Sequence, residues 1–213
     1  MLVLTNLTGL GGRAAFVPVT NTYTSGTAVA ETIPVDASHV SIECWGGGGG
    51  GGGATGKGGG GGGGGAYTIK TIALLGSDGG KTFTYTVGGA GAGSSPDGTD
   101  GGQSKVDNGT YGTVVTLRAN GGAGANQEFR GLGGTASGGD TNTSGSNGVG
   151  GGAQDGGAGG AGANGGAGGA AGTRGGDIQG QVGTAPGGGG GGDADTGGAG
   201  ANGAVGRIVF AWT

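Results

Sequence analysis

Two uninterrupted tracts of eight glycines, Gly46–Gly53 and Gly58–Gly65, constrain the fold of this chain more than any other feature of its sequence. Glycine loses more conformational entropy on folding than any other residue, and it brings no side chain from which to build a hydrophobic core. The tracts are equal in length, and only the four residues 54–57 separate them. Matched lengths predict an out-and-back hairpin whose two legs return the chain to its starting level.

Glycine accounts for 71 of the 213 residues, a fraction otherwise typical of collagen-like or disordered low-complexity chains. Collagen is excluded, because the glycines leave the Gly-X-Y register within a few triads and only 4 prolines are present. Disorder is the stronger alternative, because hydrophobic residues make up 31% of the chain and much of that fraction is alanine. A folded chain of this composition needs a source of cohesion other than a large apolar core.

Segments with strand character stand between the glycine blocks. They are rich in β-branched and aromatic residues, with partial alternation of apolar and polar positions and turn residues nearby. No segment has the period of an amphipathic helix, so the predicted class is all-β or irregular, with essentially no α-helix. The predicted strands are 27–35, 40–45, 66–74, 81–87, 113–119 and 207–212.

The glycine-rich region between residues 131 and 206 contains stretches with a period of three, such as GGA GGA GAN GGA beginning at Gly156. Three residues per turn is the repeat of the left-handed polyproline-II helix. Helices of this kind made of glycine can approach closely, so N–H···O=C bonds can form between them, with Cα–H···O contacts in support. The sequence therefore predicts a bundle of packed polyglycine-II helices framed by short β-strands.

The side chains predict where each helix lies in this bundle. A helix surrounded by neighbours has no room for a side chain on any face, so the two octaglycine tracts are expected at the centre. GGA and GAN triads leave one face for Ala or Asn and are expected on the outside. Strands then gather at one end, and the loops that join outgoing to returning arms gather at the other, which we call the tip. The predicted tip loops are 54–57, 94–100, 126–132 and 193–196.

The tip loops hold the least repetitive sequence of the chain and form the predicted recognition surface. Phe129 beside Arg130 could stack on a sugar or grip a protein surface, and anchoring of the loop is the alternative. The carboxylates of these loops are expected to stabilise turns and not to bind metal. The candidate binding residues are Thr55, Lys57, Ser95, Asp97, Asn126, Gln127, Glu128, Phe129, Arg130, Asp193 and Asp195.

Catalytic and cofactor chemistry has little support in the sequence, and neither an enzyme nor a bound metal or cofactor is expected. His39 is the only histidine, which rules out a site with several histidine ligands. Residues 51–57 match most of a phosphate-binding loop, but Gly58 stands where Ser or Thr is required. Cys44, the only cysteine, is expected to be buried as a small hydrophobic residue.

The charge pattern and hydropathy narrow the possible partners. The net charge is −4, from 9 basic and 13 acidic residues, and the basic residues are scattered. Nucleic acid is therefore not an expected partner. Membrane insertion is not expected either, because no apolar run approaches the roughly 18 residues required to span a bilayer. The first residues also lack the features of a signal peptide, so export by the usual secretion route is not expected.

The order of the segments is more specific than any single glycine run. VSIECW precedes the first octaglycine tract and AYTIKTI follows the second, and KTFTYTVGGAGAG, VVTLRANGGAGA and GANGAVGRIVFAWT come later in the chain. This succession, from about residue 27 to residue 213, resembles the glycine-rich domain of bacteriophage tail-fibre and tip-adhesin proteins. The resemblance implies a sandwich of polyglycine-II helices framed by strands, with loops at the exposed end that contact the host surface.

The resemblance also implies a role for the whole chain, as a non-enzymatic virion protein and the tip adhesin of a tail fibre or spike. Residues 1–26 are predicted to dock onto another virion protein, and residues 27–213 to form the glycine-rich domain. The expected partner at the tip is a host cell-surface protein or glycan, and a homo-oligomeric state in the virion remains open. The expected location is the virion, at a fibre tip or on the capsid surface, after synthesis in the host cytoplasm.

Two other functions are alternatives. The first is a decoration or cement protein of the capsid or tail, which would stiffen the particle without binding a receptor. The second is an ice-binding protein, since flat bundles of glycine-rich polyproline helices also occur in certain antifreeze proteins. Only the glycine-rich triads support this second alternative, and the lack of disulfides and of a secretion signal argues against it.

Overall fold

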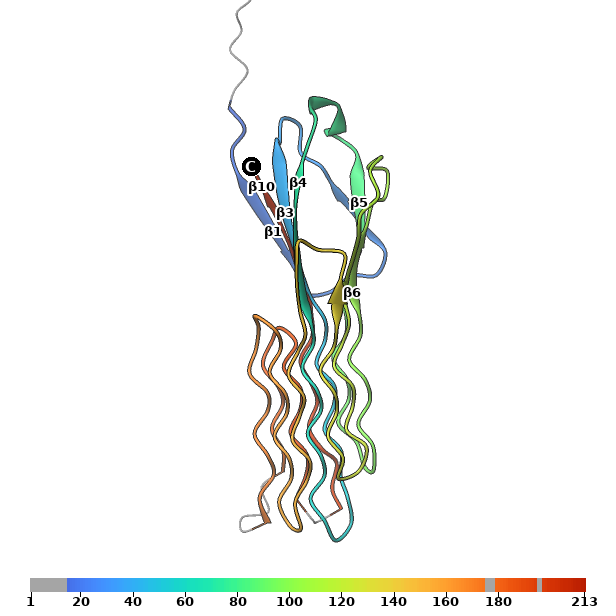
Figure 1. Ribbon diagram of the computed structural model, residues 1–213, viewed down its shortest axis with the longest axis vertical. Coiled ribbons are helices and arrows are strands. Elements are labelled where there is room, and N and C mark those ends of the chain that lie inside the picture. The colour runs from blue at the N-terminus through green and yellow to red at the C-terminus, as the bar shows by residue number, and fades with distance from the viewer. Residues whose placement is uncertain (1–14, 175–178, 195–196) are drawn as a thin grey trace, which may run out of the picture.

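The computed structural model describes residues 15–174, 179–194 and 197–213. The protein is elongated, with strands at one end and a bundle of parallel and antiparallel glycine-rich arms at the other (Figure 1). No α-helix occurs in the described residues, and η1 (Gly76–Asp78) is a single 3₁₀ turn. The predicted all-β class, with a glycine-rich bundle framed by short strands, is confirmed.

The strands of the described residues form two five-stranded antiparallel sheets. They are β1 (Val19–Tyr23), β2 (Val29–Thr32), β3 (His39–Trp45), β4 (Tyr67–Ala73), β5 (Thr82–Thr86), β6 (Ser104–Asp107), β7 (Thr116–Ala119), β8 (Ala136–Ser137), β9 (Thr141–Thr143) and β10 (Arg207–Trp212). The first sheet has the order β1-β10-β3-β4-β9, and the second has the order β2-β5-β6-β7-β8. Both sheets therefore mix strands from distant parts of the chain.

Each of the six predicted strands overlaps an observed strand, β3 begins one residue before the predicted 40–45, and β10 has the predicted bounds. β1, β6, β8 and β9 are not among the predicted strands. β6 is short and half polar (SKVD), while β8 and β9 have two and three residues inside a glycine-rich region. Such short segments carry too few apolar positions to show a period of two.

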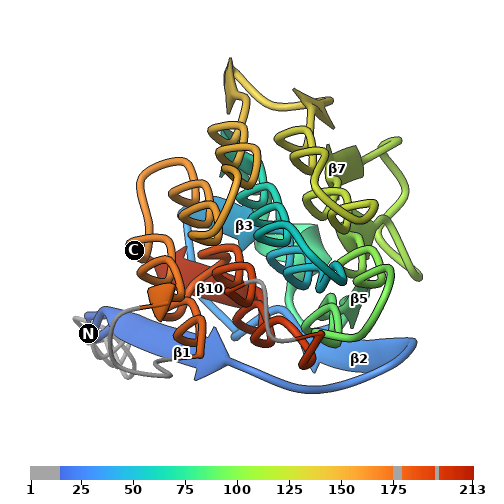
Figure 2. The same cartoon turned by 90° about the horizontal axis from the view of Figure 1, so that it is seen from below.

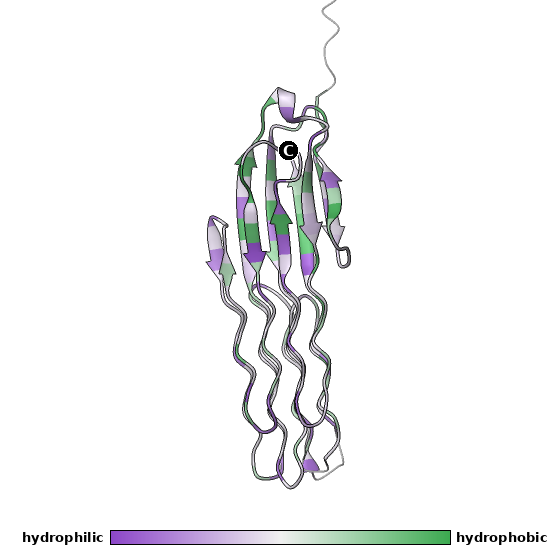
Figure 3. Ribbon diagram, turned by 90° about the vertical axis from the view of Figure 1, so that its right-hand side faces the viewer, coloured by the Kyte–Doolittle hydropathy of each residue, from purple (hydrophilic) through white to green (hydrophobic). Residues whose placement is uncertain are grey.

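The core of the sandwich lies between the inner faces of the two sheets. Every second residue of β5 and of β10 is buried, as expected when one face of a strand packs against another sheet. The Phe210 ring lies 5.8 Å from Trp212 and 6.0 Å from Phe83, between ring centroids. Hydrophobic residues are accordingly concentrated in the strands (Figure 3).

Cys44 lies in this core and is fully buried, as the sequence predicts. Burial in apolar surroundings raises the pKa of its thiol well above the ordinary range. The thiol is therefore neutral and acts as a small hydrophobic group.

Part of the predicted N-terminal docking segment belongs to the sandwich. β1 pairs with β10, with Val19 opposite Trp212. The side chains of Asn21 and Tyr23 donate hydrogen bonds of 2.7 and 2.6 Å to the carboxylate of Glu31 on β2. β1 is thus attached to both sheets, while residues 1–14 lie outside the described residues. The docking role of the segment stays a prediction.

The first octaglycine tract shows the threefold hydrogen-bonding pattern of a polyglycine-II helix. Its N–H groups donate in turn to three different neighbours, at N···O distances of 2.8–3.1 Å. Gly46, Gly49 and Gly52 donate to carbonyls of segment 60–66, Gly47, Gly50 and Gly53 to segment 96–102, and Gly48 and Gly51 to segment 201–204. Every third N–H group donates to the same neighbouring segment, so the tract has three residues per turn.

The two octaglycine tracts are the centre of the bundle, as predicted. Carbonyls of the first tract also accept hydrogen bonds from segments 88–94, 120–125 and 187–193, so that six described segments surround it. Six described segments likewise bond to the second tract: 46–53, 120–127, 131–134, 146–152, 157–163 and 187–193. Seen along the bundle axis, the arms lie side by side in a compact array (Figure 2).

A third glycine-rich segment, 187–193, is also interior, in addition to the two predicted central tracts. It exchanges hydrogen bonds with both octaglycine tracts and with four further described segments. These four are 157–160, 166–172, 181–184 and 201–205. Its six consecutive glycines (187–192) satisfy the same rule that places the octaglycine tracts at the centre.

Close packing of backbones is the reason for glycine at these interior positions. A Cβ added to Gly48 would lie 2.0 Å from the carbonyl oxygen of Gly188, and one on Gly62 would lie 2.3 Å from that of Gly49. The tract residues are buried, so water cannot satisfy their N–H groups and the bonds between helices must do so. Peptide groups take the place of apolar side chains as the interior of the bundle.

Polar side chains satisfy outward-facing N–H groups at the surface of the bundle. Four such bonds, of 2.8–2.9 Å, join Ala92 N–H to Thr99 Oγ1, Gly93 to Asn202 Oδ1, Gly124 to Asp100 Oδ1 and Gly133 to Asn147 Oδ1. Asn202 ends a GAN triad, so these bonds also explain part of the sequence pattern on the outer helices. At these positions a side-chain oxygen accepts the hydrogen bond that a carbonyl of a further helix would otherwise accept, so no further helix packs there.

Candidate recognition site at the tip

The loop between the two octaglycine tracts forms a tight turn at the tip. Ala54 and Lys57 pair across it as an isolated β-bridge. Gly56 has a φ of +77°, in the left-handed region that favours glycine. The turn leaves Thr55 and Lys57 exposed while both flanking tracts are buried.

Two more predicted tip loops are joined to each other beside this turn. Asp97 pairs with Asn126, and Asn126 also pairs with Phe129, which closes a second turn. The N–H of Gln127 donates a 3.0 Å hydrogen bond to Asp97 Oδ1. The Asp97 carboxylate therefore joins its own loop to the turn at 126–129.

An ion pair connects the first turn to the second. Lys57 Nζ lies 3.1 Å from Glu128 Oε1. A hydrogen bond from its own backbone N–H and the Lys57 ammonium group hold the pKa of Glu128 below its ordinary value. Both side chains are partly exposed to solvent, so the pair fixes their relative positions more than it stabilises the fold.

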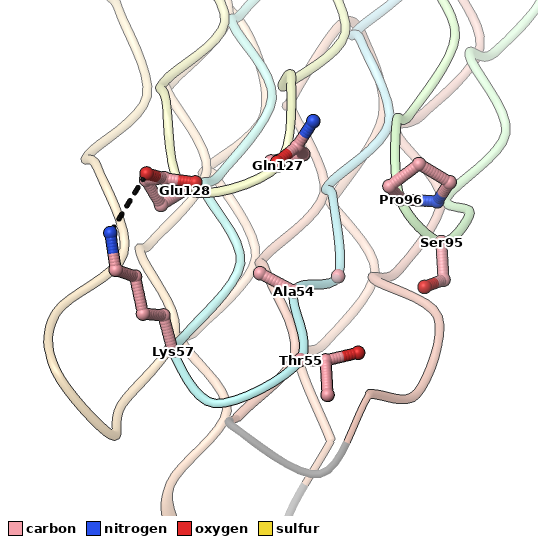
Figure 4. A pocket seen from close by; sticks show the side chains of 8 residues that line it. Ala54, Thr55, Lys57, Ser95, Pro96, Gln127 and Glu128 are labelled. Atoms are coloured by element: carbon pink, nitrogen blue, oxygen red, sulfur yellow. Dashed lines mark hydrogen bonds and ion pairs between the residues drawn. The ribbon is translucent and has the colours of Figure 1, made fainter.

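These loops enclose a pocket of about 420 Å³ at the tip. The residues that line it come from three loops, with the Lys57–Glu128 pair on one side and Ser95 and Pro96 on the other (Figure 4). Its lining residues are Gly53, Ala54, Thr55, Lys57, Ser95, Pro96, Gln127 and Glu128. Five of the predicted binding residues thus come together in one place.

The other predicted residues differ in their positions. Asn126 is part of the turn, and Phe129 and Arg130 are exposed beside the pocket without lining it, Phe129 with 66% of its surface accessible. Asp193 is only 1% exposed, so its side chain is not presented at the surface. Asp195 lies outside the described residues.

Three residues that line the pocket are not among the predicted binding residues: Gly53, Ala54 and Pro96. All three lie in or next to predicted tip loops, so their place in the sequence beside these loops is the feature that could have indicated them. Segment 96–102 also bonds to the first octaglycine tract, which makes the loop after residue 94 shorter than predicted.

The structure also shows where the candidate metal and phosphate-loop residues lie. No cluster of three or more His, Cys, Asp or Glu side chains suited to a metal occurs in the described parts of the chain. Lys57, which ends the partial phosphate-loop match, is paired with Glu128 and precedes a glycine tract instead of an α-helix.

A family model described as a glycine-rich domain matches residues 22–213. The chain belongs to this family of glycine-rich domains. A comparison with curated proteins found no match. The described residues contain no helix with the length and apolar character needed to span a lipid bilayer.

Proposed function

We propose that this protein is the tip adhesin of a bacteriophage tail fibre or spike and binds the host surface through its tip. The main support is the convergence of three loops from separate parts of the chain around one polar pocket at the end of the bundle. The sheets and β1 lie at the opposite end, where the N-terminal segment would dock onto another virion protein (Figure 1).

A difference between the interior and the tip also supports this proposal: side chains are excluded from the one and allowed at the other. Interior positions of the bundle exclude any side chain, so they can carry no specificity. The tip loops are not bound by that restriction, because most of the side chains at 55–57, 95–97 and 126–130 are exposed to solvent. A closely packed bundle that ends in loops free of this restriction is the arrangement expected of a recognition protein.

Replacing Lys57, Ser95 and Phe129 together by alanine should reduce adsorption of particles that carry the protein by about tenfold or more. Loss of interface residues worth about 1.4 kcal/mol or more in total has this effect. Adsorption is measured as the rate at which free particles disappear in the presence of host cells. All three side chains are exposed or partly exposed, so the fold should be retained.

The matched control is Leu75→Ala with Val114→Ala, two exposed residues of the sandwich end that are 70% and 76% accessible. This variant should adsorb like the parent. Unchanged adsorption of the tip variant would contradict the proposal. If particles without the protein also adsorbed normally but lost physical stability, a decoration role would be favoured instead.

A further inference from the structure

The tip pocket contains neutral polar groups that the fold does not use. The hydroxyl groups of Thr55 and Ser95 and the carboxamide of Gln127 make no hydrogen bond to the described residues. Each of these groups can both donate and accept a hydrogen bond. Together they provide the polar contacts that a small polar ligand requires.

Gln127 is held in position by its backbone. Its φ of +50° is uncommon for a residue other than glycine. The conformation is fixed from both sides, because the N–H bonds to Asp97 and the carbonyl accepts a 2.6 Å hydrogen bond from Gly60 N–H. Glycine would adopt this conformation with less strain, yet the chain has glutamine here, and its side chain lines the pocket.

The charge in the pocket is balanced. Lys57 and Glu128 neutralise each other at 3.1 Å, and the remaining lining residues are uncharged. An anion would compete with Glu128 and a cation with Lys57. A neutral ligand rich in hydroxyl groups avoids this competition and can bond to both members of the pair.

We propose that the pocket binds one neutral sugar unit of a host-surface glycan, an inference that rests on the proposed attachment function. The hydroxyl groups of a sugar match Thr55, Ser95 and Gln127, whereas an apolar side chain of a protein receptor would leave these groups desolvated and unpaired. The volume of about 420 Å³ lies within the range of small-ligand sites. The structure thus favours a glycan over a protein as the ligand of this pocket.

Saturation-transfer NMR with the full-length protein tests this proposal, using the methyl glycosides of glucose, galactose, mannose and N-acetylglucosamine as probes. At least one probe should give a saturable signal, and Gln127→Gly should weaken its binding about tenfold or more. This substitution removes the carboxamide and relieves the backbone strain, so the variant should fold at least as well as the parent. Gln127→Asn, which keeps a carboxamide and tolerates the same φ, should retain part of the binding.

The matched control is Gln154→Gly, an exposed glutamine outside the pocket, which should bind like the parent. The proposal is overturned if no glycoside binds, or if binding is equal in the parent and in Gln127→Gly. A second arm compares the isolated surface polysaccharide of the host, with and without its lipid, to distinguish a free glycan from a lipid-linked one. Adsorption that depends on Lys57, Ser95 and Phe129 but is not inhibited by any glycan would overturn the sugar site and leave the attachment function intact.

Discussion

Gly62→Ala should destabilise the protein by about 3 kcal/mol or more, because overpacking a close-packed interior costs about 1–3 kcal/mol and occasionally more. The added Cβ would lie 2.3 Å from the carbonyl oxygen of Gly49 and 2.6 Å from that of Gly50. Both contacts are to backbone, so relief requires two helices to move apart and to weaken the hydrogen bonds between them. With about 2–4 °C per kcal/mol for a chain of this size, the melting temperature should fall by roughly 6–12 °C.

Gly89→Ala is the matched control, because Gly89 is exposed on an outer helix and a Cβ there has no atom within 4 Å. This variant should be unchanged or stabilised by about 0.4–1 kcal/mol, since alanine lowers the entropy of the unfolded chain. Thermal unfolding followed by circular dichroism measures both variants. Equal melting temperatures for the two would show that the central tract is not closely packed.

Phe210→Ala should cost about 3–5 kcal/mol, the usual effect of removing a buried phenylalanine ring from a core. Phe210 is fully buried, and ring centroids of Phe83, Tyr85 and Trp212 lie within 6.1 Å of its own. β10 is also paired with β1 and β3, so a cavity here weakens the sheet from which several arms extend. The free energy of unfolding is measured by urea denaturation.

Phe129→Ala provides the comparison for this variant, because the same ring is lost from a side chain that is 66% exposed. Its effect on stability should remain within about 0.5 kcal/mol, as for other surface substitutions. If Phe210→Ala were equally mild, the sandwich would contribute little to stability. The bundle would then have to fold without support from the sheets.

The main architecture was predictable because glycine tracts and strand segments alternate along the chain. An interior helix excludes every side chain, so two unbroken tracts of equal length predict a central pair joined by a turn at 54–57. The strand segments predict that the far loops meet at one end, and 54–57, 94–97 and 126–130 do meet there. The residues that line the pocket lie in these loops, so their proximity follows from the alternation of glycine arms and strands.

Other features could not be read from the sequence, because they depend on the order of helices in the lattice. β8 and β9 form only because adjacent arms align them with β7 and β4. The burial of Asp193 has the same origin. The pocket role of Gln127 depends on a positive φ that is imposed by Asp97 and Gly60.

The strands and the glycine helices stabilise the protein in complementary ways. Ordering one residue costs about 1–2 kcal/mol of backbone entropy, whereas a hydrogen bond returns only about 0.5–1.5 kcal/mol net. The glycine arms therefore need both close packing and fixed ends. The sandwich supplies the fixed ends. The first octaglycine tract begins directly after β3, and only Ala66 separates the end of the second tract from β4.

Amide hydrogen exchange, followed by NMR on the full-length protein, tests most directly whether peptide groups form the interior of the bundle. The N–H groups of residues 46–53 and 58–65 should exchange about as slowly as those of β3 and β10, because each is buried and bonded to a neighbouring helix. Exchange of these glycine amides within minutes, while β3 and β10 stay protected, would contradict a hydrogen-bonded glycine interior.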